Sequence, residues 1–317
     1  MSTASELSHG RQILALERAF GPQILALLQD PKIVEVMLNP DGKLWIDELG
    51  GSMSCVLQVD PIRARTILDT VAAILETVIT PDSPILECEL PLDGSRFEGL
   101  IPPLVVNPVF TIRKKALQVF TLADYVAKGI MSQAQLEVIE AAISLRQNIL
   151  VIGGTGSGKT TLVNAVLEAV ARIWAENRII VIEDTRELQV KSENVVFLRT
   201  ADNTDMTRLL RATMRLRPDH IVVGEVRDGS ALALLKAWNT GHPGGAGTVH
   251  ANHALAALIR IEQLIEEVST KPQQKLIAEA VNVVVSIART PTGRIVKEVL
   301  RVKGWSEAGG YDVEQLA

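Results

Sequence analysis

A phosphate-binding loop is the first chemistry that the sequence offers. Residues 153–160 fit the pattern G-x-x-x-x-G-K-[ST], between a predicted strand and a predicted helix. Glycines let backbone N–H groups turn toward phosphate oxygens, and the start of the helix adds the positive end of its dipole. We expect Lys159 to contact the β- and γ-phosphates of ATP and Thr160 to bind Mg²⁺. The residues predicted to hold the nucleotide are Gly153, Gly154, Thr155, Gly156, Ser157, Gly158, Lys159, Thr160 and Thr161.

Two further predicted strands end in acids. The apolar segment 178–182 leads into Glu183, and the segment 220–223 leads through Gly224 into Glu225. In an open parallel sheet such ends lie in the crevice where ligands bind. Because ATP hydrolysis needs a carboxylate near the metal and a group that orients water, Glu183 and Glu225 are predicted to serve catalysis and Mg²⁺, directly or through water. Which of them is the general base stays open, and a solvated strand end is the alternative for either acid taken alone.

A glycine-rich stretch over residues 241–253 carries three histidines, His242, His250 and His253. Glycines around a histidine indicate a loop whose backbone comes close to a ligand, and we favour a sensor of the γ-phosphate. A zinc site formed by the three histidines is one alternative, although the glutamate at helical spacing that would strengthen it is missing. Histidines with only a structural or surface role are the other alternative.

The order of predicted elements indicates two domains. Residues 1–115 mix helices with short strands, including a hairpin turned at 39–42, which predicts an α+β domain. Residues 116–131 are predicted as a linker. From residue 132 strands alternate with helices, which predicts an α/β domain with a mostly parallel sheet over 132–317 and a loose tail over 306–317.

Composition excludes several classes of protein. The net charge of −5 argues against a protein that grips a nucleic-acid backbone. Neither a signal peptide nor a membrane-spanning run is visible, so we expect a cytoplasmic protein whose membrane contact is peripheral. Cys55 and Cys88 are too few for a zinc tetracysteine, and we expect two buried free thiols.

The motifs together resemble the secretion ATPase superfamily. Residues 153–160, 182–187, 217–228 and 240–253 are similar to its Walker A, Asp box, Walker B and His box. In its segment 182–185 and in its lack of a zinc tetracysteine, the chain resembles the type IV secretion branch of this superfamily. Within that branch it is similar to the P-type conjugative-transfer ATPases of the Trb system. The resemblance implies a P-loop NTPase fold of the RecA-like kind.

The resemblance also implies a function and a set of roles. It implies a homohexameric ring that hydrolyses ATP to power a conjugative type IV secretion apparatus and meets inner-membrane components of that channel. By the same match His250 senses the γ-phosphate with His242 as its companion, and Arg96 and Arg113 reach the nucleotide from the N-terminal domain. Two alternatives stay open: a motor of type II secretion or type IV pili, and a nucleotide-gated docking platform with slow turnover.

Overall fold

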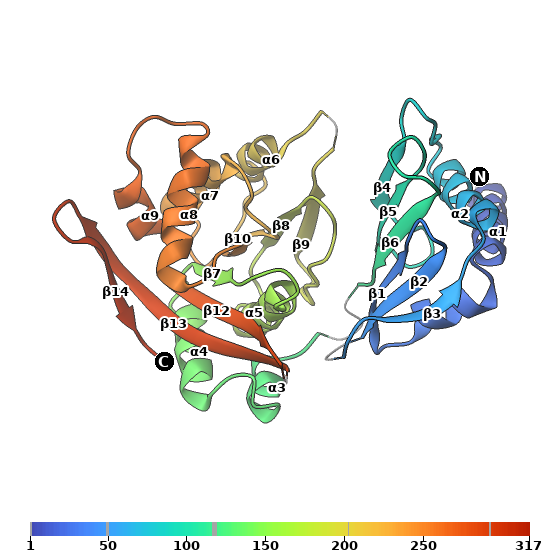
Figure 1. The fold of residues 1–317 in the computed structure, drawn as a ribbon. Helices are drawn as coiled ribbons and strands as arrows, with labels where there is room; N and C mark the ends of the chain where they lie inside the picture. The colour runs from blue at the N-terminus through green and yellow to red at the C-terminus, as the bar shows by residue number, and fades with distance from the viewer. Residues whose placement is uncertain (1, 49–50, 116–118, 202, 292) are drawn as a thin grey trace. The chain divides into compact units, whose positions relative to one another are not determined.

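The computed structural model describes residues 2–48, 51–115, 119–201, 203–291 and 293–317. The chain forms two compact units, Met1–Leu117 and Gln118–Ala317 (Figure 1). Each unit has a hydrophobic core of its own.

The N-terminal unit is a six-stranded antiparallel sheet with two helices on one face (Figure 1). Its strands run in the order β3-β2-β1-β6-β5-β4, and its core includes Phe20 of α1, Phe97 of β5 and Phe110 of β6. The helix α1 is kinked at Gly21, directly before Pro22. The elements are α1 (Ser2–Gln29), β1 (Ile33–Leu38), β2 (Lys43–Glu48), β3 (Ser54–Gln58), α2 (Pro61–Ile74), β4 (Ile85–Glu89), β5 (Arg96–Leu100) and β6 (Val109–Arg113).

The C-terminal unit is built on an eight-stranded sheet in the order β14-β13-β12-β7-β11-β10-β8-β9. The six strands from β12 to β9 are parallel, and β13 and β14 are antiparallel additions at one edge. The strands are β7 (Ile149–Ile152), β8 (Ile179–Glu183), β9 (Val195–Arg199), β10 (His220–Val223), β11 (Ala246–Val249), β12 (Val283–Thr290), β13 (Gly293–Ser306) and β14 (Gly310–Gln315).

Helices cover both faces of this sheet, as expected for short apolar strands buried on two sides (Figure 1). Alternate residues of one strand enter different cores: Ile149 and Val151 pack with α3, α4 and α5, whereas Leu150 and Ile152 pack with α6 to α9. The helices are α3 (Leu122–Ala127), α4 (Gln133–Ser144), α5 (Lys159–Ile173), α6 (Met206–Thr213), α7 (Ser230–Asn239), α8 (Ala254–Glu266) and α9 (Gln274–Ala280). The predicted α/β fold is confirmed.

The structure differs from the sequence prediction in three places. Residues 116–118 of the predicted linker lie outside the described residues, and the rest contains α3, because Leu122 and Tyr125 are apolar enough to join the core. The tail predicted to be loose contains β14, which pairs with β13 while Val313 packs on the core. The two cysteines are free, but Cys55 is exposed and Cys88 only partly buried, because β3 and β4 are the two edge strands of the sheet.

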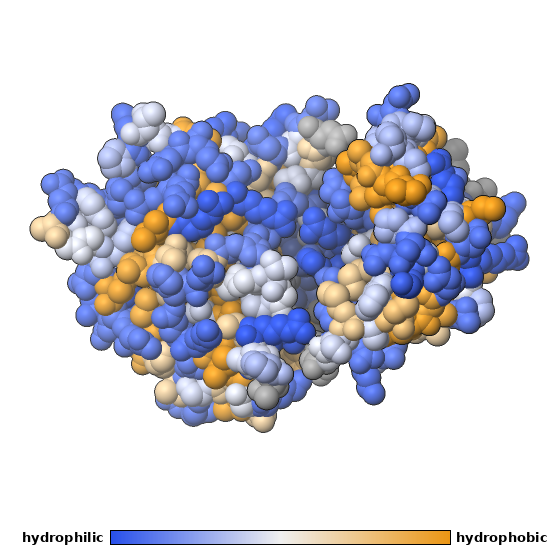
Figure 2. Space-filling view, viewed as in Figure 1, coloured by the Kyte–Doolittle hydropathy of each residue, from blue (hydrophilic) through white to orange (hydrophobic). Residues whose placement is uncertain are grey.

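Polar residues dominate the face of the molecule in Figure 2, with apolar side chains gathered in separate patches. Among the described helices, none combines the length and the apolar character that crossing a bilayer requires.

The amide of Asn148 joins three elements at the amino edge of the large sheet. Asn148 is buried; its Oδ1 accepts from the N–H of Gly245 at 2.9 Å, and its Nδ2 donates to the carbonyl of Ala280 at 2.7 Å. Asn148→Ala should therefore lower the free energy of unfolding by about 2–3 kcal/mol, because both backbone groups lose a partner in a buried place. Urea unfolding measures the change.

The matched control is Asn107→Ala, since the exposed Asn107 amide also bonds to a carbonyl, that of Pro40. It should change stability by less than about 0.5 kcal/mol. Equal losses in the two variants would contradict the role given to Asn148.

Candidate functional site

The phosphate loop joins the carboxyl end of β7 to the start of α5. Gly158 has φ of 95°, a left-handed conformation that a side chain would strain, so the final glycine of the motif is required by the backbone itself. The Lys159 side chain is mostly buried, and its ammonium donates to the carbonyl oxygens of Gly153 at 2.9 Å and Gly154 at 3.0 Å. The loop thus places the predicted phosphate-binding lysine against its own backbone.

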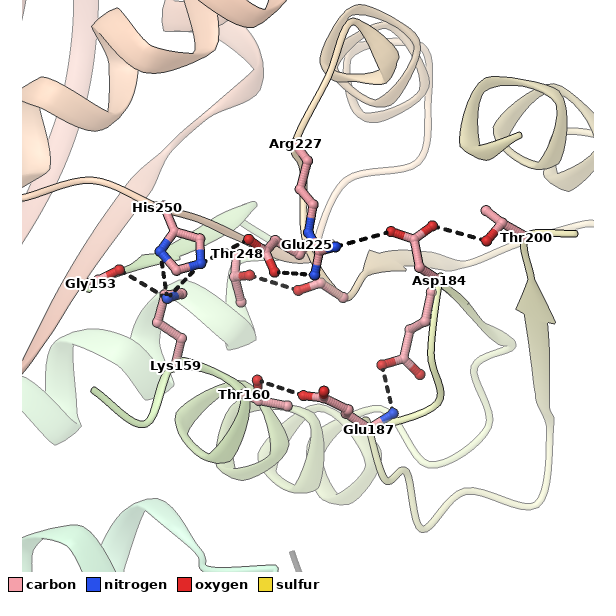
Figure 3. Close-up of polar contacts among 12 residues, drawn as sticks. Gly153, Lys159, Thr160, Asp184, Glu187, Thr200, Glu225, Arg227, Thr248 and His250 are labelled. Carbon is pink, nitrogen blue, oxygen red and sulfur yellow. Dashed lines mark hydrogen bonds and ion pairs between the residues drawn. The ribbon is translucent and has the colours of Figure 1, made fainter. Parts of the chain in front are cut away.

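His250 lies directly beside Lys159 (Figure 3). It follows β11, and its Nδ1 is 3.4 Å from the Lys159 ammonium. Burial lowers the pKa of His250, and the positive charge of Lys159 lowers it further, so the imidazole is neutral at pH 7. A tautomer with its proton on Nε2 donates to Glu225 and leaves Nδ1 to accept from Lys159.

Glu225 stands at the centre of a chain of polar contacts (Figure 3). Its Oε1 is 2.9 Å from Nε2 of His250, and its Oε2 accepts from Nη2 of Arg227 at 2.8 Å. Arg227 also approaches Asp184 at 3.9 Å, and Asp184 accepts from the hydroxyl of Thr200 at 3.0 Å. The ends of β8, β9, β10 and β11 are therefore joined by one network that begins at the phosphate loop.

A hollow of about 220 Å³ opens beside this network. Asp184, Glu225 and Arg227 line it together with the first turn of α6. The side chain of Glu225 is 21% exposed, so one face of this acid meets solvent.

Glu183 has a different environment from Glu225. It is buried at the end of β8, where its Oε1 accepts from the backbone N–H groups of Glu187 at 3.1 Å and Leu188 at 3.0 Å. A Cβ on Gly224 would lie 2.8 Å from Cγ of Glu183, so the glycine of the neighbouring strand makes room for it. Burial raises the pKa of Glu183 from 4.5 to about 7.

The acid that reaches the predicted metal ligand is Glu187. Its Oε2 accepts from the hydroxyl of Thr160 at 3.3 Å. The two hydrogen bonds that Glu183 accepts from backbone N–H groups fix the turn that carries Glu187. Glu187 is not among the site residues predicted from the sequence, although it lies inside the segment likened to the Asp box. Its spacing of four residues from Glu183 was the signal that could have found it.

The histidines predicted together are not brought together. His242 precedes β11 and His250 follows it, so they lie at the amino and carboxyl edges of the same sheet. Nδ1 of His253 accepts from the N–H of Ala256 and caps α8. Among the described residues no three His, Cys, Asp or Glu side chains are grouped to hold a metal ion, which leaves the zinc alternative without support.

Arg96 and Arg113 lie opposite each other on β5 and β6, on the sheet face that the helices leave uncovered. Arg113 donates to Glu35 of β1 at 2.6 Å. The two arginines belong to the N-terminal unit, and their reach toward the nucleotide stays a prediction.

Residues 20–307 match the family model described as "Type II/IV secretion system protein". The chain belongs to this family, and the resemblance to the secretion ATPases is confirmed. ATP hydrolysis is the activity that this membership implies.

Two relatives match over nearly their whole length. The "Probable conjugal transfer protein TrbB" of Sinorhizobium fredii is 49% identical over 97% of this chain and 94% of its own. The "Conjugal transfer protein TrbB" of Rhizobium radiobacter is 48% identical over 98% of this chain and 96% of its own. The resemblance to the Trb system is therefore confirmed as well.

Solved structures share the fold at lower identity. The pilus retraction motor PilT with bound ADP is 20% identical, with a TM-score of 0.62 over 95% of this chain and 81% of its own. The ATPase DotB of Legionella pneumophila is 15% identical, with a TM-score of 0.62 over 86% of this chain and 77% of its own.

The buried Glu183 should make stability fall between about pH 4.5 and pH 7. The folded protein keeps a proton on this carboxyl up to about pH 7, whereas the unfolded chain releases it near pH 4.5, so unfolding releases a proton in this window. The loss is on the order of 3 kcal/mol. Glu183→Gln should remove it, because glutamine has no charge to bury and keeps an acceptor oxygen for the turn.

Urea unfolding at pH 5 and pH 8, without nucleotide or metal, gives the difference for parent and variant. Glu225→Gln is the control and should keep the loss, because it leaves the buried Glu183 carboxyl in place. A Glu183→Gln variant that loses as much stability as the parent would contradict the assignment.

Proposed function

We propose that this chain is the ATPase that powers a conjugative type IV secretion apparatus. The network from Lys159 through His250 to Glu225 carries the proposal, because it couples the phosphate loop to an acid at the carboxyl ends of parallel strands. The names of the relatives that match over nearly the whole chain supply the biological setting.

In the proposed mechanism the loop binds the phosphates of ATP through its backbone N–H groups. The Lys159 ammonium exchanges the carbonyl oxygens of Gly153 and Gly154 for phosphate oxygens, which carry more negative charge. Thr160 and Glu187 offer the hard oxygen ligands that Mg²⁺ prefers. When bound with ATP, Mg²⁺ neutralises charge on the transferred phosphoryl group.

Glu225 is the proposed general base. Its exposed face can hold a water, while the neutral His250 donates to one of its oxygens and Arg227 to the other. Glu183 is instead the proposed positioning residue, since its Oε1 already holds two backbone N–H groups of the turn that carries Glu187. The Mg²⁺ contact predicted for Glu183 passes to Glu187 in this proposal.

His250 is the proposed sensor of the γ-phosphate. Lys159 and Glu225 are the two polar neighbours of the His250 imidazole. A γ-phosphate that draws Lys159 away removes one of them, and the hydrogen bond between His250 and Glu225 changes as a result. Arg227 and Asp184 extend the same chain to Thr200 at the end of β9, so the state of the nucleotide reaches the rim of the sheet.

The assembly belongs to the proposal as well. We propose a homohexameric ring on the cytoplasmic side of the inner membrane, in contact with membrane components of the channel. Arg96 and Arg113 would reach the nucleotide in such a ring, and their charge would stabilise the phosphoryl group in the transition state. Light scattering with and without a non-hydrolysable ATP analogue tests the ring, and a monomer under both conditions would contradict it.

Two variants separate ATP binding from hydrolysis. Lys159→Ala should abolish ATP binding, because the loop loses the charge that faces the phosphates. Glu225→Gln should keep the dissociation constant for ATP within a few-fold and lower turnover by about 10²- to 10³-fold, because the amide accepts no proton from water. Calorimetry measures binding, phosphate release measures turnover, and plasmid transfer should fail with either variant.

The control is Lys236→Ala, which removes the same charge from an exposed position on α7. It should leave binding, turnover and transfer unchanged. Parental turnover in Lys159→Ala would overturn the assignment of the loop, and parental turnover in Glu225→Gln would overturn that of the base.

A further inference from the structure

The hairpin of β12 and β13 flanks the phosphate loop on the side away from the acids. β12 pairs in parallel with β7 from Val283 to Ser286, so its continuation from Ile287 runs beyond the end of β7, beside the loop. Figure 1 shows the two strands of this hairpin passing α5. Thr292, between the two strands, lies outside the described residues.

One face of this hairpin leads from the core to the loop. Ile287 pairs with Val296 and Arg289 with Arg294, and directly paired residues of antiparallel strands share a face. Ile287 and Val296 are buried in the core that includes α5. Arg289 and Arg294 therefore continue that face beyond the core.

Arg294 touches the loop itself. A Cβ added to Gly158 would lie 3.0 Å from Cδ and 3.1 Å from Nε of Arg294, so the guanidinium stem passes directly beside the start of α5. Nε of Arg294 is buried, and no residue that the structure describes accepts a hydrogen bond from it. A buried donor without an acceptor costs free energy, which a ligand that supplies an oxygen recovers.

The direction of the nucleotide follows from the sheet order. Glu187, Glu225 and His250 follow β8, β10 and β11, all on one side of β7, whereas β12 lies on the other side. The γ-phosphate must face the acids, because water attacks there. The α-phosphate and nucleoside then lie toward the β12–β13 hairpin.

We propose that Arg294 binds the α-phosphate of the nucleotide held by the loop. A guanidinium is the side chain best suited to phosphate oxygens, and its unpaired Nε lies on the side where the α-phosphate leaves the loop. This inference rests on the proposed nucleotide binding and adds the residue that fixes the nucleoside end. Lys159 and Arg294 then hold opposite ends of the phosphate chain.

The test compares ADP with the two diastereomers of ADPαS, in which sulfur replaces one α-oxygen, by calorimetry on the full chain without metal. Arg294→Gln should weaken ADP binding by about tenfold or more. The parent should bind one diastereomer several-fold more weakly than ADP, since sulfur accepts hydrogen bonds poorly. In Arg294→Gln that discrimination should shrink toward one, and Arg294→Lys should restore part of it.

The control is Arg301→Gln on the same strand, where the arginine is exposed and pairs with Glu314. It should bind ADP and ADPαS as the parent does. Equal weakening of ADP and ADPαS in Arg294→Gln would indicate a merely structural role, and unchanged ADP binding would also overturn the inference. A parent chain that bound no ADP would instead overturn the proposed function.

Discussion

Burial of short parallel strands on both faces is the constraint on which the whole site depends. β7, β8, β10 and β11 are only four or five residues long, and their side chains enter two cores at once. A shift of one residue in any of them would exchange the two sets of side chains, so the register is fixed by packing. The position of each strand end, and of the polar residue that follows it, is fixed with the register.

That constraint explains why one hydrogen-bond network can join four strand ends. Each acid or histidine of the network lies just past the end of a buried strand, where the chain first meets polar surroundings. Asp184 and His250 follow β8 and β11 directly, and Glu225 follows β10 after one glycine. His250 reaches Glu225 directly and Arg227 bridges Glu225 and Asp184, because the strands that carry these residues are neighbours in the sheet. The burial that sets these distances also makes the site sensitive to charge, as the raised pKa of Glu183 and the lowered pKa of His250 indicate.

The sequence was most informative where a motif coincided with a strong pattern of hydrophobicity. The phosphate loop lies where the sequence predicted it, between the strand β7 and the helix α5. The C-terminal tail could not be predicted as a strand, because its alternation of Tyr311 and Val313 is short and the strand forms only against β13.

The roles of single side chains were less predictable, because they depend on contacts between distant segments. Nothing in the sequence distinguished the buried Glu183 from the partly exposed Glu225, since both end apolar strands. His242 and His250 were grouped by their proximity in the chain, although a strand between them places them at opposite edges of the sheet. The role of Arg294 could not be predicted, because this residue lies beside Gly158, which is 136 positions away in the sequence.

The strand β14 has a consequence for solubility. Without it, residues 300–306 of β13 would be unpaired at the edge of the sheet, a surface to which strands of other molecules can add. β14 is shorter and carries Asp312 and Glu314, and Glu314 pairs with Arg301 and Lys303 of β13. A short, charged strand thus covers this part of the edge, and the sheet is guarded against the addition of strands from other molecules there.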